Sequence, residues 1–156
     1  MRRFEDFVPA GLCARKEAGW IASGYALSAL WSLGFLLRYF TARSSLFQIV
    51  NGKKVLWEGA KIDPFPELLD SALLGFAAVA IAMVLLALWH LLYHYQGSRS
   101  IDLMRRLPRK GELPLRCLAL PLAGAIGAGV LAALLYGIYF AVYRLCTPAA
   151  ALPGLF

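Results

Sequence analysis

The chain has 156 residues, of which 60% are hydrophobic and only 16% are charged, and its formal net charge is +7. A soluble domain has about 45–50% apolar and about 25% charged residues, so this composition excludes an ordinary soluble globular domain. The apolar residues form long uncharged blocks, which are typical of helices that cross a bilayer. The basic residues flank these blocks, so they indicate membrane orientation, and we expect no nucleic-acid partner.

The amino-terminal part of the chain contains a surface segment and a first span. Residues 1–18 mix apolar and basic side chains, and we expect them to lie on the membrane surface. No apolar stretch precedes Cys13, so we find no cleavable signal peptide and expect Met1 to belong to the mature protein. Residues 19–39 form the first predicted transmembrane helix, because they are long enough to cross a hydrocarbon core of about 30 Å.

The loop at residues 40–70 is expected to lie outside the membrane and to carry a β-hairpin. Asn51-Gly52 separates two β-prone runs, the second of which ends at Trp57. This dipeptide predicts a hairpin because both residues tolerate the positive φ angles of a type I′ turn. Farther along, Pro66 suits the first turn of a helix.

Two further spans follow the hairpin loop. Residues 71–95 and 117–143 are predicted to form the second and third transmembrane helices, joined by a basic loop at 96–116 and followed by an external tail at 144–156. The fold class is therefore an all-α integral membrane protein of one domain, with three spans, an extracytoplasmic hairpin and a short cytoplasmic helix.

The distribution of basic residues predicts the orientation. With three spans, the amino terminus and the 96–116 loop share one side of the membrane. Ten Lys and Arg residues lie on that side and six on the other, which accounts for all 16. Because Lys and Arg are retained in the cytoplasm, we expect a multi-pass plasma-membrane protein with a cytoplasmic amino terminus.

Small residues recur every fourth position along the third span and predict a helix-packing ridge, because they let another helix come close. The ridge comprises Ala125, Gly129, Ala133, Gly137 and Ala141. A weaker series in the first span comprises Gly24, Ser28 and Ser32, whose hydroxyls can bond across helices or to their own backbone. Either ridge can serve within the chain or face a second polypeptide.

Catalytic and cofactor motifs are not found. The sequence has neither G-x-S-x-G nor a phosphate-binding G-x-x-x-x-G-K-[ST] loop, and no ionisable residue lies in the middle of a span. His90 and His94 share one helical face and offer a weak signal for metal or haem, but their aromatic neighbours favour an interfacial belt. We therefore expect no enzyme activity, no metal and no cofactor.

The 96–116 loop contains the best candidate for partner binding. Residues 98–107 begin with capping serines and end before Pro108, which predicts a short helix. Ile101, Leu103, Met104 and Leu107 would give this helix an apolar side for docking. The alternative is that the helix lies on the headgroups, with its arginines on anionic lipid.

The run from Ser100 to Pro108, followed by Arg109-Lys-Gly-Glu-Leu113 and a span, resembles the cytoplasmic segment between the second and third helices of ABC-2-type transporter permeases. In that family a short coupling helix rests on the ATP-binding subunit. The resemblance implies apolar contacts from the four side chains named above and charge from Arg105 and Arg106. Because such permeases usually have six spans, it implies a half-sized permease or an accessory subunit.

The favoured function is therefore a non-catalytic membrane subunit of an ABC-type transporter complex. Its expected partners are the bilayer, other membrane subunits and a cytoplasmic ATP-binding subunit. One alternative is a standalone scaffold or immunity-like protein that binds a partner through the external hairpin, at Asn51, Gly52 and Trp57. Another is a small haem-binding membrane protein.

Overall fold

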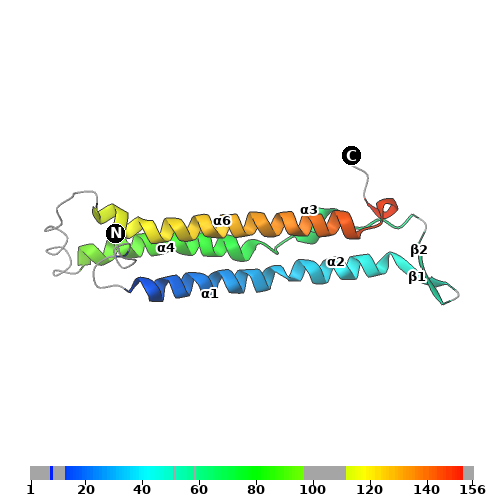
Figure 1. Ribbon diagram of the computed structural model, residues 1–156, viewed down its shortest axis with the longest axis horizontal. Helices are drawn as coiled ribbons and strands as arrows, with labels where there is room; N and C mark the ends of the chain where they lie inside the picture. The colour runs from blue at the N-terminus through cyan, green and yellow to red at the C-terminus, as the bar shows by residue number, and fades with distance from the viewer. Residues whose placement is uncertain (1–7, 9–12, 51, 58, 97–111, 153–156) are drawn as a thin grey trace.

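A computed structural model describes residues 8, 13–50, 52–57, 59–96 and 112–152. The described chain forms an elongated helical bundle with a hairpin at one end (Figure 1). In chain order its elements are α1 (Ala14–Ser32), α2 (Gly34–Ser45), β1 (Phe47–Val50), β2 (Lys53–Leu56), α3 (Phe65–Leu69), α4 (Leu74–Gln96), α6 (Glu112–Cys146) and the short 3₁₀ helix η2 (Ala149–Ala151). The predicted combination of mostly helical structure, three long apolar helices and one two-stranded sheet is confirmed.

Three stretches of the described chain are long and apolar enough to cross a membrane, namely Ala14–Ser45, Leu74–Leu92 and Leu115–Cys146. The first begins before the predicted boundary at residue 19, because the basic and acidic residues after Cys13 continue the helix instead of ending it. Large apolar side chains face outward along all three stretches. They include Trp20, Leu27 and Leu37 on α1–α2, Ile81, Leu85 and Trp89 on α4, and Leu122, Ile126 and Leu134 on α6.

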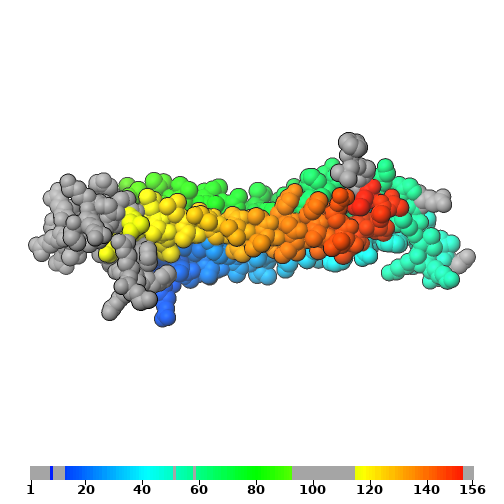
Figure 2. All heavy atoms as spheres, turned by 45° about the horizontal axis from the view of Figure 1, so that its top comes forward, coloured from blue at the N-terminus to red at the C-terminus, as the bar shows by residue number. Residues whose placement is uncertain are grey.

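The helices pack through small residues at close crossings. A Cβ built on Gly75 of α4 would lie 3.0 Å from the backbone Cα of Ser28, and one on Gly24 would lie 3.2 Å from a methyl group of Val79. Two members of the glycine-serine series predicted on the first span, Gly24 and Ser28, are therefore used within the chain, between α1 and α4. Figure 2 shows α6 along the front of the rod, between α4 and α1–α2.

An aromatic core occupies the hairpin end of the bundle. The 32 residues of Ala14–Ser45 extend over about 48 Å at about 1.5 Å per residue, which exceeds a hydrocarbon core of about 30 Å. The part of this stretch nearest the hairpin packs against residues 62–72 and against the end of α6. Phe35 stacks on Tyr139 at 4.6 Å between ring centroids, and Phe65 meets Phe35 edge-on at 5.7 Å. The other buried members of this core are Tyr39, Leu46, Ile62, Leu68, Ala72, Tyr143 and Ala151.

Polar side chains within the core bond to one another. The Ser32 hydroxyl lies 2.7 Å from the Tyr139 hydroxyl, and the Tyr39 hydroxyl lies 3.1 Å from that of Thr147. Tyr143 donates to the Asp63 carbonyl at 3.2 Å. Because a buried hydroxyl without a partner is costly, these bonds fix how α1–α2 and α6 face each other.

The hairpin confirms the strands predicted on either side of Asn51-Gly52. Phe47 pairs with Leu56, and Val50 pairs with Lys53 in an antiparallel register. Gly52 has a φ of 76°, in the left-handed region that a tight hairpin turn requires. Asn51 lies outside the described residues.

The glycine contacts between α1 and α4 generate a stability prediction. Gly75→Val should lower the free energy of unfolding by about 1–3 kcal/mol, because the new side chain would overlap the backbone of α1. The measurement is unfolding in mixed micelles titrated with SDS.

The matched control for this substitution is Gly129→Val on α6, where an added Cβ would meet nothing within 4 Å. This control should change stability by no more than about 0.5 kcal/mol. Equal effects of the two substitutions would contradict the close α1–α4 crossing.

Candidate functional site

The end of the bundle opposite the hairpin brings the starts of α1 and α6 next to the end of α4 (Figure 1). The predicted docking residues belong to the segment that joins α4 to α6. They are Ile101, Leu103, Met104, Arg105, Arg106 and Leu107, and all of them lie outside the described residues. What the structure describes is the base from which this segment departs.

A buried histidine joins the three helices at this base. The side chain of His90 is 0% exposed. Its Nδ1 lies 3.0 Å from the carbonyl oxygen of Cys117 in α6, and its Nε2 lies 3.2 Å from each carboxylate oxygen of Glu17 in α1. One side chain of α4 therefore contacts both neighbouring helices through hydrogen bonds, and we refer to these three residues as the His90 junction.

The proline in α6 explains why this carbonyl is available. In an α-helix the carbonyl of residue 117 would accept from the amide of residue 121, but Pro121 has no N–H group. The carbonyl of Cys117 is thus left without its helical donor inside a buried contact. His90 supplies the missing hydrogen bond, which offsets the cost of an unsatisfied buried acceptor.

The partners of His90 also determine where its protons lie. A carbonyl oxygen can only accept, so Nδ1 of His90 carries a proton and donates it to Cys117. Nε2 then faces the Glu17 carboxylate at hydrogen-bond distance.

The interpretation of the two histidines as members of an interfacial belt is wrong for His90. Its neighbour Trp89 is 58% exposed, as a belt residue should be, but His90 points between the helices. Successive residues of a helix are about 100° apart, so an outward tryptophan places the next side chain on another face. Pro121 was the sequence feature that could have indicated this buried contact, because a proline within a span frees one carbonyl for a donor from another helix.

The β1–β2 hairpin exposes apolar side chains. Ile49 is 74% exposed and Trp57 is 59% exposed, while Val50 and Val55 are each 47% exposed. Gly52 is exposed as well. The sheet has two strands, so each strand has an edge without a strand neighbour among the described residues. Of the predicted hairpin site, Gly52 and Trp57 are therefore accessible at the surface.

The predicted ridge on α6 faces away from the other helices. Gly129, Ala133, Gly137 and Ala141 are exposed, and only Ala125 is half-buried. Within the described chain, nothing lies within 4 Å of a Cβ built at Gly129 or Gly137. Contacts inside the bundle instead use Gly124 and Gly127 of the same helix, which approach Met83 and Tyr25. Contact of the ridge with a second polypeptide stays a prediction.

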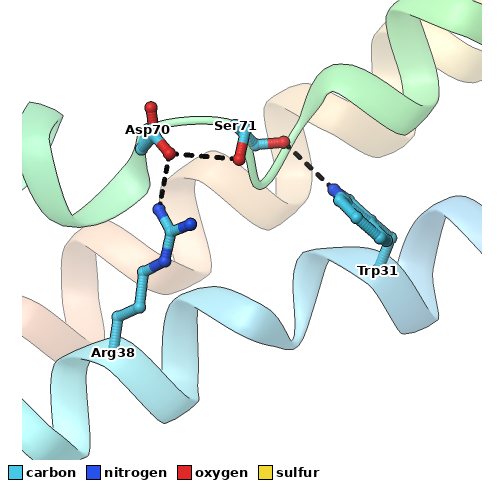
Figure 3. A network of polar contacts seen from close by, with 4 residues as sticks. All are labelled: Trp31, Arg38, Asp70 and Ser71. Carbon is cyan, nitrogen blue, oxygen red and sulfur yellow. Dashed lines mark hydrogen bonds and ion pairs between the residues drawn. The ribbon is translucent and has the colours of Figure 1, made fainter.

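A second polar network lies at the opposite end of the apolar belt and joins α1–α2 to the turn between α3 and α4 (Figure 3). Arg38 donates through Nη1 to Asp70 at 2.7 Å, and Ser71 donates to the same carboxylate oxygen at 3.1 Å. Trp31 donates from Nε1 to the Ser71 carbonyl at 3.3 Å. The Arg38 guanidinium holds the pKa of Asp70 below its ordinary value, and the Ser71 amide and hydroxyl add to this effect.

Asp70 itself has an unusual backbone conformation, with φ of 32° and ψ of −117°. Positive φ is uncommon for a residue with a side chain, and a ψ of −117° lies outside the left-handed helical region in which aspartate is usually found when φ is positive. Such strain persists where neighbouring contacts fix the residue, and here the ion pair to Arg38 and the bond from Ser71 do so. The network thus shapes the reversal from α3 into α4.

Comparison with protein-family models, with curated proteins and with solved structures finds no match for this chain. Its function must therefore be inferred from the features described above.

The His90 junction gives a direct prediction. His90→Ala should lower the free energy of unfolding by about 2–4 kcal/mol, because it leaves a cavity and removes the partner of two buried acceptors. The measurement is unfolding of the purified protein in mixed micelles.

Leu92→Ala serves as the control, since Leu92 lies two positions away on α4 and is 54% exposed. It should cost no more than about 0.5 kcal/mol. A His90→Ala protein as stable as this control would show that the junction does not hold the helices together.

Proposed function

We propose that the chain is a non-catalytic membrane subunit of an ABC-type transporter complex, docking an ATP-binding subunit or a permease through residues 98–107. The proposal begins from the resemblance of Ser100–Pro108 to a coupling segment. Its structural support is one observation, the His90 junction, which ties all three helices at the base of this segment. A force applied to the segment would then reach the three helices together.

The mechanism that follows is rigid-body coupling. Closure of an ATP-binding partner would displace residues 98–107, which lie in the chain between α4 and α6. Because Glu17 of α1 bonds to His90 of α4, α1 would move together with α4 and α6. At the other end, Arg38 and Asp70 connect α1–α2 to the α3–α4 turn, so the motion would be a tilt of the whole bundle and not a sliding of one helix.

The orientation of this proposal comes from the charges. The positive-inside bias of ten basic residues against six favours a plasma-membrane protein with residues 96–116 in the cytoplasm, where an ATP-binding subunit resides. The hairpin and the aromatic core would then face outward from the cell.

A second candidate function is favoured by the hairpin. A two-stranded sheet is marginal alone, and this one exposes Ile49 and Trp57 well beyond the bundle. Exposed apolar side chains next to a strand edge that has no strand neighbour in the described chain suit a protein partner that adds a strand. In this reading the chain is a scaffold or immunity-like protein whose partner binds outside the cell.

One experiment separates the two functions. The tagged chain is purified in mild detergent from its own host membranes, and co-purifying ATPase is quantified by mass spectrometry and ATP hydrolysis. The double variant Leu103→Asp and Leu107→Asp should reduce the recovered ATPase about 30-fold or more, because a charge in an apolar contact costs at least about 2 kcal/mol.

The matched control is the double variant Ile49→Asp and Trp57→Ser, which changes two exposed hairpin residues. It should leave ATPase recovery as in the unaltered protein. Absence of any ATPase from the unaltered protein would refute the transporter proposal, and loss of a partner only in the hairpin variant would favour the second function.

A further inference from the structure

A cleft opens beside the Arg38–Asp70 ion pair, between α1–α2 and the α3–α4 turn. It is an open groove of about 350 Å³, within the size range of sites that hold small molecules. Its apolar wall includes Leu30, Trp31 and Leu37, and its polar end includes Arg38 and Ser71. The cleft is therefore amphipathic along its length.

The position of the cleft matches a membrane boundary. Leu30, Trp31 and Leu37 are 64%, 64% and 72% exposed and belong to the apolar belt. Arg38 comes immediately after Leu37 along α2, and its ion-pair partner Asp70 lies at the end of α3. Tryptophan is enriched at the level of lipid headgroups, and the Trp31 indole is fixed there by its bond to Ser71.

The charges at the polar end of the cleft identify the headgroup that fits: Arg38 lines the cleft, and Asp70 lies beside it, bonded to Arg38 and Ser71. Arg38 and Asp70 bond through one nitrogen and one oxygen, yet their side chains remain 50% and 58% exposed. A guanidinium has five N–H donors, so others are available to a phosphate. The free carboxylate surface of Asp70 favours a cation beside that phosphate and disfavours a second negative charge.

We propose that this cleft binds an ammonium-bearing glycerophospholipid, of the phosphatidylethanolamine class, from the leaflet on the hairpin side. The phosphate meets Arg38, the ammonium meets Asp70, and the start of one acyl chain lies along Trp31 and Leu37. This binding site is independent of the function proposed above.

Gly34 provides a way to close the cleft without disturbing the backbone. It lines the cleft at the start of α2, and a Cβ built there would meet nothing within 4 Å. Gly34→Leu therefore places a side chain in the space of the lipid. Gly19→Leu is the matched control, because Gly19 is also open but lies near the other end of α1.

The test is native mass spectrometry of the full chain in detergent with equal amounts of phosphatidylethanolamine and phosphatidylglycerol that carry identical acyl chains. The unaltered protein should retain phosphatidylethanolamine about two- to fivefold better, the range expected for one exposed charge pair. Gly34→Leu should lose this retention, whereas Gly19→Leu should keep it. Soluble glycerophosphoethanolamine, which lacks acyl chains, should not displace the lipid.

Asp70→Asn tests the charge assignment separately, because asparagine has the size and shape of aspartate but no charge. It removes the carboxylate and should reverse the preference toward phosphatidylglycerol. Equal retention of both lipids by the unaltered protein, retention unchanged by Gly34→Leu, or a preference unchanged by Asp70→Asn would each overturn the proposal.

Discussion

The outward faces of α1, α4 and α6 are apolar along most of their length, and lipid hydrocarbon is the solvent that suits them. This condition removes the usual hydrophobic force between helices, since lipid is as apolar as leucine. The helices must then associate through close packing and hydrogen bonds. The contact between Gly75 and Ser28 is an example of close packing, and the His90 junction provides hydrogen bonds.

Polar contacts accordingly connect the helices near both ends of the apolar belt, and Tyr25 donates to the Gly124 carbonyl between them. At one end a proline frees a carbonyl, and a histidine with a glutamate partner fills the gap between three helices. At the other end Arg38 and Asp70 hold the α3–α4 turn against α2, next to the aromatic core. Together these contacts connect all three long helices to one another, a property that a coupling subunit would need.

The fold was predictable where local patterns determine structure. Uncharged length indicated the three helices, and Asn51-Gly52 indicated the hairpin and its strands, because both signals depend on neighbouring residues only. The face that each helix turns toward the other helices was not predictable. A four-residue repeat marks a ridge at Gly129 and Gly137 but does not say which way the helix turns, and the structure points that ridge outward. His90 was missed because its partner Glu17 is 73 residues away.

The most direct test of the account is the sidedness of its two ends. With the three native cysteines replaced by serine, Lys54→Cys and Arg99→Cys are labelled in intact cells with a membrane-impermeant maleimide. The account predicts labelling of the hairpin cysteine in intact cells and labelling of the loop cysteine only after permeabilisation. Labelling of both positions from outside, or of the loop position alone, would contradict it.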